Sequence, residues 1–339
     1  MIAYIARRLA FLVVICFGVT LMTFLISHVI PGDPARLVAG PGADKAQILA
    51  IRAHFGLDKP IPDQYLLYLD NLAHGDLGTS IVSREPVTTA LSRRIPATLE
   101  LVIVSFVVYL IAGLALAVLA ATTRLRSIDV TIRLLATAAF AIPAFVLALW
   151  LQLIFFFHLG WLPSSGRLDV VTTPPGKVTG SYLIDSLLAG DWSIFVDAAR
   201  HLVLPGAALT FGLLAIAVRL TRATLLSELD KDYVKMARLK GLSEWAIIRR
   251  HVLRNALVPS LALYGIQFGY LIGGTVVVES IFSWPGLGAY AFDSVAALDY
   301  APVMGVTLVA TAIFVLVNFV IDLLYPVIDP RIRLWGHTS

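Results

Sequence analysis

The stretch LLSELDKDYVKMARLKGLSEWAIIRRHVLRNALVP, residues 225–259, is a densely charged segment in an otherwise apolar chain. Its first half carries side chains of one apolar face at helical spacing: Leu225, Leu229, Tyr233 and Met236. Its second half does the same with Trp245, Ile248 and Val252. The stretch therefore predicts two amphipathic helices separated by a break, here called the hairpin.

The break falls at Gly241, a residue type that commonly ends a helix in the left-handed conformation. Ser243 can cap the second helix, and Glu244 lies in its first turn, near the positive end of the helix dipole. Such an elbow between two membrane spans is a rigid lever. An amphipathic loop lying on anionic lipid headgroups has the same pattern, and periodicity does not separate these two interpretations.

Composition identifies the class of protein. The chain has 339 residues, of which 58% are hydrophobic and 14% are charged, whereas soluble domains are about half apolar and a quarter charged. We therefore expect an integral membrane protein. The single cysteine, Cys16, excludes a disulfide or a cysteine-based metal site within the chain. The one Gly-Lys pair, Gly176-Lys177, lacks the other residues of a phosphate-binding loop, so the chain does not bind ATP by that route.

Six uncharged runs predict six membrane spans, at residues 9–32, 101–123, 134–166, 201–218, 255–278 and 300–321. The first run exceeds the apolar core of a signal peptide, so we expect it to stay as a span. The third is long enough for a span plus a re-entrant or interfacial tail, with a kink at Pro143. The fourth is short and contains Pro205, so it either ends early or continues into the hairpin.

Polar segments separate these runs. Residues 33–95 predict a compact segment with short helices at 44–55 and 61–73, after a sharp helix end at 31–34. This segment fits either a lid on the membrane part or a docking surface outside it. Pro96 is predicted to start the second span, with Glu100 in its first turn. Residues 182–188 predict a further amphipathic helix, and Tyr325-Pro326 and Asp329-Pro330 are predicted to end the last span.

Charge predicts the orientation. Six spans place both termini on one side, and the segments on that side carry 16 basic and 7 acidic residues, against 10 and 15 on the other. Because positive residues stay cytoplasmic, the termini and the hairpin are predicted inside and the 33–95 segment outside. The hairpin could then address only a cytoplasmic partner.

The middle of each predicted span lacks Asp, Glu, Lys and Arg. Proton relays and ion-coupled carriers use such buried groups, which argues against a secondary transporter. No histidine pair or carboxylate pair has the spacing of an intramembrane protease or an oxidoreductase. His28, His158 and His201 lie near predicted span ends, where we expect them to be solvated and not bound to a metal.

Three amides, Gln152, Gln267 and Asn318, are the larger polar side chains within the predicted spans. They could make hydrogen bonds between helices, or they could line a neutral and polar passage.

Residues 233–243 of the hairpin, YVKMARLKGLS, resemble the cytoplasmic signature loop of permease subunits in type I ABC importers. The likeness is to the dipeptide, oligopeptide and nickel group. The motif's alanine and glycine correspond to Ala237 and Gly241, and the proline typical of this group stands at Pro259. Lys235-Met236 replaces the first two positions of the more general Glu-Ala-Ala start, so the chain departs from the wider family there.

Further segments resemble the same group in the same order, and together they cover nearly the whole chain. They are residues 30–34, 55–60, 75–78, 96–100, 161–167, 282–288 and 322–333.

The resemblance implies an all-α integral membrane fold with six transmembrane helices and an extracytoplasmic helical segment between the first two. Residues 1–32 would form a cytoplasmic start and the first span, and residues 33–95 the extracytoplasmic segment. Residues 96–326 would form the permease core, which contains the hairpin at 225–257, and residues 327–339 a cytoplasmic tail.

The resemblance also implies the function: a permease subunit, not an enzyme, of an ATP-driven importer in the bacterial inner membrane. Di- or oligopeptides are the expected substrate; a nickel chelate, glutathione or another small solute is the alternative. The expected partners are a homologous second permease, two cytoplasmic ATPases that bind ATP and Mg²⁺, an extracytoplasmic solute-binding protein and membrane lipid, but no nucleic acid. The permease itself would need no cofactor, metal or catalytic residue.

The same resemblance places the contact with the ATPases on the hairpin, at Ala237, Gly241, Leu242, Ser243, Trp245, Ile248 and Arg249. Arg249 could pair there with an acidic group of the ATPase or with lipid. Gln152, Gln267 and Asn318 remain the candidates for a substrate path. A more remote alternative is a membrane assembly protein whose hairpin binds a partner other than an ATPase.

Overall fold

The computed structural model describes residues 2–29, 34–40, 42–54, 56, 58–123 and 125–328, and these residues form helices and connecting loops without a β-strand. Three of the described helices are long and apolar enough to cross a membrane: α5 (Val87–Thr122), α9 (Trp192–Leu229) and the Tyr300–Ile321 part of α14 (Tyr300–Ile328). A broken pair of helices, given below, could provide a fourth span. The expected all-α membrane architecture is confirmed, while the count of six spans stays a prediction.

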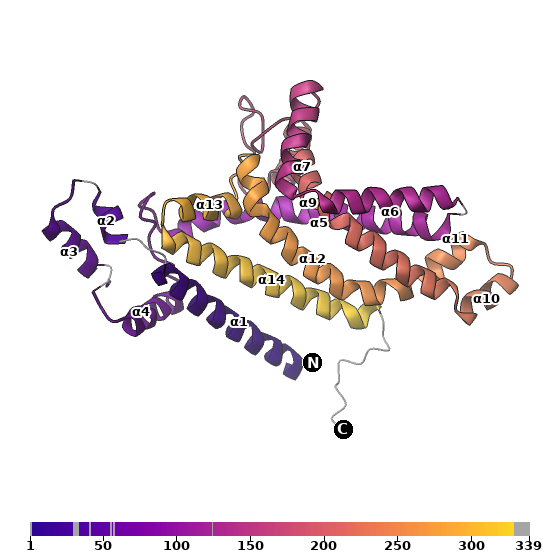
Figure 1. The fold of residues 1–339 in the computed structure, drawn as a ribbon, viewed down its shortest axis with the longest axis horizontal. Helices are drawn as coiled ribbons and strands as arrows, with labels where there is room; N and C mark the ends of the chain where they lie inside the picture. Colours follow the sequence, from indigo (N-terminus) through magenta and orange to yellow (C-terminus); the bar gives the residue numbers. More distant parts are fainter. Residues whose placement is uncertain are drawn as a thin grey trace.

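The long helices form an elongated bundle (Figure 1). Its central member is α9, which packs against α5, against α6 (Arg126–Ala141) and against α12 (Leu253–Ile281). Arg222 of α9 fastens α6 with two hydrogen bonds to the carboxylate of Asp129, at 2.7 and 2.9 Å. On the other side, α14 packs against both α12 and α1 (Ile2–Val29).

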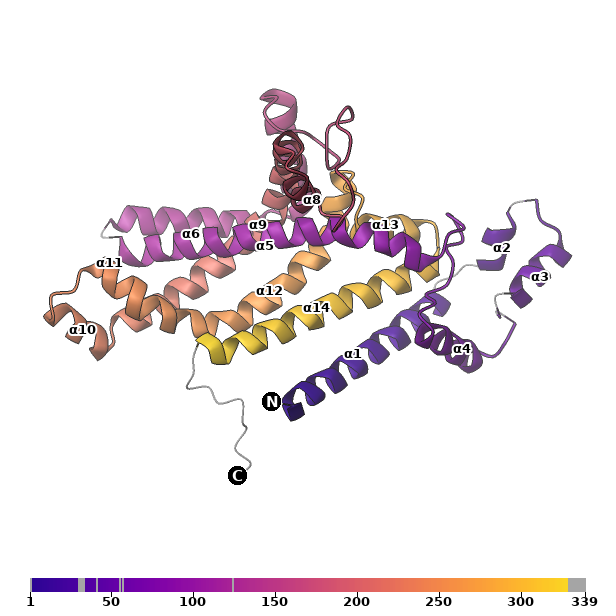
Figure 2. The ribbon, with the colours of Figure 1, turned by 180° about the vertical axis from the view of Figure 1, so that it is seen from behind.

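Short helices occupy the two ends of the bundle. One end carries α10 (Asp232–Leu239) and α11 (Glu244–Ile247), which belong to the hairpin. The opposite end carries α2 (Pro34–Ala39), α3 (Lys45–His54) and α4 (Ile61–Ala73), as both Figure 1 and Figure 2 show. The helices predicted at 44–55 and 61–73 are thus present, whereas α2 was not predicted.

The predicted kink at Pro143 is a right-angled break. The axis of α6 and that of the following pair, α7 (Ala144–Leu151) and the π-helical η1 (Gln152–His158), differ by 103°. Pro143 holds Ile142 in the extended region, with φ −86° and ψ 122°, because a proline ring crowds the residue before it. As a result α7 projects from the side of the bundle (Figure 1). Both α7 and α8 (Tyr182–Ala189), the predicted amphipathic helix, pack against α9.

One helix start predicted from a proline is wrong: Pro96 lies inside α5, which starts nine residues earlier at Val87. Pro326 also lies inside a helix, because α14 continues to Ile328, while the stop predicted at Asp329-Pro330 falls outside the described residues. A proline removes one backbone hydrogen bond, and neighbouring helices in a membrane bundle can compensate for that loss. Pro205 and Pro259 likewise lie inside α9 and α12. The predicted helix end at 31–33 and the tail from 329 onward fall outside the described residues.

One connection follows an alternative expected from the sequence, and another was not predicted. The fourth span does continue into the hairpin, since α9 runs unbroken for 38 residues to Leu229. The aromatic turn at 282–288 leads into a helix that was not predicted, α13 (Leu287–Ala296), which packs on α12 and α14.

The closest approach between α5 and α9 depends on Gly113. A Cβ atom built at Gly113 would lie 2.8 Å from the Cβ of Ala217, closer than two carbon atoms can pack. By contrast, a Cβ atom built at Gly212 on α9 would have no atom within 4 Å. The two glycines therefore differ in packing space while sharing a helical backbone.

Gly113→Ala should therefore destabilise the protein relative to Gly212→Ala, by about 1–3 kcal/mol, because the added methyl group forces α5 and α9 apart. Both substitutions gain the same helix propensity, so the difference isolates the packing cost. Thermal unfolding of the two variants in one detergent measures it. Equal unfolding temperatures would contradict the close crossing.

Candidate functional site

The hairpin turns at Gly241, whose φ of +78° lies in the left-handed region. Its N–H donates to the carbonyl of Arg238 at 2.9 Å, and the N–H of Leu242 donates to the carbonyl of Ala237 at 3.3 Å. These two bonds form a Schellman motif, which satisfies the last carbonyls of α10. The left-handed helix end predicted at Gly241 is confirmed.

The second arm of the hairpin begins as predicted. The hydroxyl of Ser243 accepts a hydrogen bond from the N–H of Ala246 at 3.4 Å and so caps α11. Glu244 accepts two hydrogen bonds from Arg238, at 2.8 and 3.2 Å, and these bonds link α10 to α11. They also raise the pKa of Arg238, because they favour its charged form. The elbow therefore has a defined shape.

The hairpin is joined to the bundle by a buried apolar cluster, here called the root. Six elements contribute to it: α5, α9, α10, α11, α12 and the π-helical η2 (Ile248–Val252) between α11 and α12. Its buried members are Ala117, Leu225, Val234, Ala237, Ile247, Val252 and Ala256. Because interiors are close-packed, a force on the hairpin reaches three long helices directly.

A hydrogen-bonded chain reinforces the root. The hydroxyl of Tyr233 donates to the carboxylate of Glu228 at 2.7 Å and accepts from the Nδ2 of Asn255 at 3.2 Å. Burial and the Glu228 carboxylate raise the pKa of Tyr233, so its hydroxyl stays protonated and continues to donate. This chain connects the end of α9, the start of α10 and the start of α12.

The predicted apolar faces of the hairpin are partly wrong. Met236 and Trp245 are 55% and 64% exposed, while Val234 and Ile247 are buried in their place. Two irregularities shift the faces. The helix breaks after Leu229, so α10 starts in a new phase, and the π-helical η2 has more residues per turn than an α-helix.

The predicted coupling residues divide into two groups. Ala237 and Ile248 are buried in this chain. Gly241, Leu242, Ser243, Trp245 and Arg249 are exposed. Sequence reasoning overlooked Leu239, which is 83% exposed. The exposed apolar side chains, here called the tip, are Met236, Leu239, Leu242 and Trp245.

The three amides predicted for a substrate path lie on η1, α12 and α14. Gln152 donates to the carbonyls of Ser164 and Ile281, at 2.7 and 3.3 Å, and so ties η1 to other segments. Asn318 donates to the carbonyl of Phe314 in its own helix at 2.9 Å. Gln267 is buried in α12. Their role in a path stays a prediction.

A cleft of about 820 Å³ opens between α5, α12, α13 and α14. None of the three amides lines it. Glycines and threonines contribute to its wall, and the described lining residues carry no charge. A cleft with an uncharged wall is the feature of this fold closest to the neutral passage expected from the sequence.

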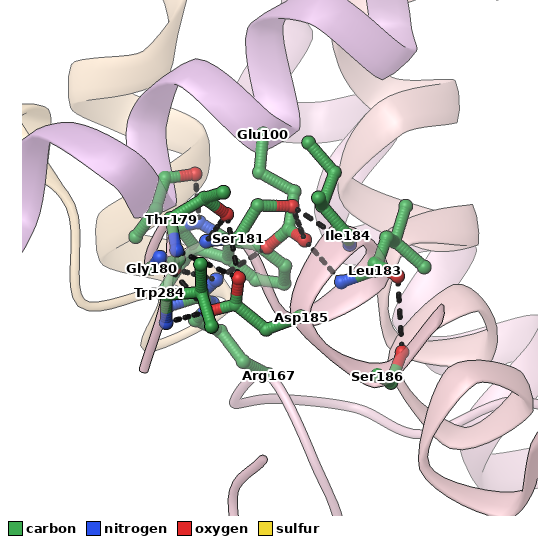
Figure 3. A network of polar contacts seen from close by, with 12 residues as sticks. Glu100, Arg167, Thr179, Gly180, Ser181, Leu183, Ile184, Asp185, Ser186 and Trp284 are labelled. Carbon is green, nitrogen blue, oxygen red and sulfur yellow. Dashed lines mark hydrogen bonds and ion pairs between the residues drawn. The ribbon is translucent and has the colours of Figure 1, made fainter. Parts of the chain in front are cut away.

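A buried polar network centred on Glu100 and Arg167 lies beside the half of α5 that is farther from the hairpin (Figure 3). Glu100 forms an ion pair with Arg167 and accepts hydrogen bonds from the hydroxyl of Ser181 at 2.7 Å and the N–H of Leu183 at 2.8 Å. Arg167 also donates to the carbonyl of Gly180 at 3.0 Å. Glu100 thus lies well inside α5, not in its first turn, and binds the loop before α8.

Asp185 stabilises the same loop (Figure 3). Its carboxylate accepts hydrogen bonds from the N–H groups of Val178, Thr179 and Gly180, at 2.8 to 3.2 Å, and from the Thr179 hydroxyl at 2.7 Å. Burial acts to raise the pKa of Asp185, but these hydrogen bonds outweigh it, and the pKa lies below its ordinary value.

A second buried carboxylate, Glu279 at the end of α12, organises the turn into α13. It accepts hydrogen bonds from the Thr98 hydroxyl at 2.7 Å and from the N–H groups of Gly288 and Ala289, at 2.7 and 3.0 Å. The indole of Trp284 donates to the carbonyl of Ala97 at 2.9 Å and lies next to Arg167. The segments 96–100, 161–167 and 282–288, which resemble the importer group one by one, therefore meet at one place.

Comparison with known proteins agrees with this arrangement. Residues 113–334 match the family described as binding-protein-dependent transport system inner membrane component, and residues 1–102 match the N-terminal region of such membrane components. The chain belongs to this family. It is therefore a multi-pass permease subunit of a transport system in the inner membrane, and it is not an enzyme.

Curated relatives match over almost their whole length. The chain is 45% identical to the probable D,D-dipeptide transport system permease DdpB of Escherichia coli K12, over 96% of each chain. It is 44% identical to the di/tripeptide transport system permease DppB of Pseudomonas aeruginosa, over 98% of this chain and 99% of that one. It is 38% identical to the glutathione transport system permease GsiC of Escherichia coli O6:H1, over 98% and 99%.

A solved structure supports the fold. The inward-facing methionine ABC transporter MetNI matches with a TM-score of 0.51 and 20% identity, over 69% of this chain and 93% of that one. At this identity the likeness concerns the fold alone.

Arg167→Met should destabilise the permease by about 3–5 kcal/mol, because it leaves the carboxylate of Glu100 buried without its partner. Arg93→Met is the control: Arg93 pairs with Glu85 on the surface, where an ion pair contributes about 0–1 kcal/mol. Thermal unfolding of both variants in detergent tests the difference. A double variant with Glu100→Gln should recover part of the loss, and equal destabilisation by the two arginine substitutions would count against the network.

Proposed function

We propose that this permease forms the membrane pathway of an ATP-driven importer for di- or tripeptides, and that the hairpin couples it to cytoplasmic ATPase subunits. The observation that supports this coupling is the division of the hairpin into an exposed apolar tip and a buried root. An isolated subunit has no reason to expose four large apolar side chains on a rigid elbow unless a partner covers them.

The expected coupling mechanism is mechanical. An ATPase groove would take up the tip, with Leu242 and Trp245 supplying apolar area and Arg249 available for an acidic group or a lipid phosphate. The Schellman turn at Gly241 would set the angle of entry. Movement of the ATPases would then pass through the root to α5, α9 and α12, whose displacement changes access to the pathway.

The orientation proposed from charge has support in the fold. The start of α1 and the end of α14 both point toward the end of the bundle that carries α10 and α11 (Figure 1). With that end in the cytoplasm, the termini lie inside, and α2, α3 and α4 lie outside. Six spans over 1–326, the extracytoplasmic segment 33–95 and the cytoplasmic tail 327–339 complete the proposed organisation.

The proposed partners complete the importer. A homologous second permease would close the cleft between α5, α12, α13 and α14, which is open on this chain, and the two subunits would share the pathway. Two ATPases would bind the hairpins of the pair and supply ATP and Mg²⁺. A solute-binding protein would deliver substrate to the end formed by α2, α3 and α4.

Peptides are the substrate class that the relatives favour, since the two most similar ones described above are named for dipeptides or di- and tripeptides. The glutathione permease is a more distant relative. An uncharged cleft wall fits a pathway that tolerates varied side chains and leaves selection to the binding protein. A nickel chelate or glutathione remains the alternative cargo of the same machinery.

The substrate class can be tested with the reconstituted complex of both permeases, both ATPases and the binding protein. We expect ATP hydrolysis to rise when the binding protein carries a dipeptide or tripeptide, and to stay near its basal rate with glutathione or a nickel chelate. Stimulation by one of these other solutes alone would replace the peptide assignment and leave the importer assignment in place.

Gly241→Asp should abolish peptide-stimulated ATP hydrolysis and uptake while leaving membrane insertion intact. A clash within this chain is not the reason, because no atom lies within 4 Å of the position of a Cβ at Gly241. Aspartate also tolerates a left-handed backbone better than most residues. We therefore attribute the expected loss mainly to a charge placed in the ATPase groove, and a matched control separates this effect from backbone strain.

Gly190→Asp is the matched control. Gly190 ends α8 with φ +69°, also has no atom within 4 Å of its Cβ position, and lies far from the hairpin. It should retain coupling. Equal loss in the two variants would indicate backbone strain as the cause, and full activity of Gly241→Asp would contradict the proposed coupling.

A further inference from the structure

Three residues near the start of α9 form a compact polar group that transport does not explain. Asp197 and His201 lie one helical turn apart on α9, and Asp169 reaches them from the loop that follows η1. One ligand atom from each residue lies within 4.8 Å of those of the other two. His201 is 4% exposed, so the expectation that this histidine is solvated is wrong.

The hydrogen bonds of His201 fix which ring nitrogen is available. Nδ1 lies 2.9 Å from the backbone carbonyl of Asp197, and because a carbonyl only accepts, Nδ1 carries the hydrogen. In the neutral ring Nε2 then presents a lone pair. This pattern, with one nitrogen bonded to a carbonyl and the other free, is the one that metal-binding histidines usually show.

The free nitrogen faces negative charge. Nε2 lies 3.9 Å from the carboxylate of Asp169, too far for a hydrogen bond, and both atoms are acceptors. The neighbouring cations are engaged elsewhere: Arg200 donates to the carbonyl of Trp161 at 2.9 Å, and Arg167 pairs with Glu100. The carboxylate of Asp197 lies 3.1 Å from Nδ1, so the buried imidazole has one carboxylate beside each ring nitrogen, an arrangement that is unfavourable without a cation.

We propose that Asp169, Asp197 and His201 bind a divalent transition-metal ion, with Zn²⁺ as the best-fitting ion. One imidazole and two carboxylates are ligands that Zn²⁺ accepts, whereas Ca²⁺ and Mg²⁺ prefer oxygen alone. Ligand atoms around Zn²⁺ are about 3.4 Å apart in a tetrahedron, so the group needs to contract only slightly. Asp169 is 60% exposed at the side chain, which leaves the ion a route of entry from solvent.

The bound ion would fasten the loop to α9. The N–H of Asp169 already donates to the carboxylate of Asp197 at 3.0 Å, so the loop and the helix are in register for a shared ion. The same loop carries Arg167, the partner of Glu100. The ion would therefore hold the loop against the helix and favour the buried network of Figure 3. This role does not depend on the direction or the cargo of transport.

The test uses the purified permease complex in detergent, isolated with a tag that contains no histidine and stripped with a chelator. Zn²⁺ is titrated in competition with a chromophoric chelator, and metal content is measured after dialysis. We expect one Zn²⁺ per chain, displaced by neither Ca²⁺ nor Mg²⁺. Binding should raise the unfolding temperature, and Co²⁺ in its place should give the visible absorption of a low-coordinate site.

Two substitutions test the assignment. His201→Ala should weaken Zn²⁺ binding more than about 100-fold, and Asp169→Asn about 10–100-fold. Even substitutions of residues that only orient the metal ligands lower metal affinity by about 10–100-fold. Asp169→Asn changes an exposed side chain, so it is informative even if His201→Ala fails to fold. His158→Ala and Asp293→Asn alter an exposed histidine and an exposed aspartate elsewhere and should bind as the unmodified chain does.

The proposal is overturned if the unmodified complex shows no saturable Zn²⁺ binding, or if Asp169→Asn binds as tightly as the unmodified chain. If no metal binds and His201 gives the signal of an imidazolium at neutral pH, then a proton on His201 supplies the positive charge in place of a metal ion. Either result leaves the importer function untouched, because the binding measurement requires neither ATP nor a peptide.

Discussion

The packing of the hairpin root is the interaction on which the rest of the structure depends. Short helices such as α10 and α11 are not stable alone, and their order comes from Val234, Ala237 and Ile247 buried against α5, α9 and α12. In the proposed function the same burial would let the hairpin act as a lever, because movement of the tip would displace the long helices. Stability and the proposed coupling would then have one physical source.

The contacts that α5 and α12 make away from the hairpin use a different chemistry. Glu100 and Glu279 are buried carboxylates within long helices, and each is compensated: Glu100 by Arg167 and by polar groups of the following loop, Glu279 by the Thr98 hydroxyl and by the first N–H groups of α13. Buried charges of this kind are costly unless fully paired, so they specify one arrangement of the loops. Apolar helices alone could slide against one another, and these two carboxylates give the packing of this part of the bundle a defined register.

Much of this could be predicted from the sequence. The membrane class, the short helices of the 33–95 segment, the turn at Gly241 and the cap at Ser243 follow from composition and local rules, and they are found where expected. Local rules failed at Pro96, where packing across α5 outweighs the preference of proline for a helix start. They also failed for Met236 and Trp245, because neither the break after Leu229 nor the π-helical turn η2 leaves a periodic signal. The meeting of Asp169 with His201 and of Glu100 with Arg167 depends on tertiary structure, which a single sequence does not encode in any local pattern.

The most direct test of the coupling account is a chemical probe at the tip of the hairpin. With Cys16 replaced by serine, a single cysteine is introduced by Leu242→Cys, or by Val170→Cys in the fully exposed loop near α8 as a reference. In the assembled importer the cysteine at position 242 should cross-link to an ATPase subunit and resist a membrane-impermeant thiol reagent added to intact cells. The cysteine at position 170 should react with that reagent and form no such cross-link. Labelling of position 242 from outside, without an ATPase adduct, would contradict the coupling role of the hairpin.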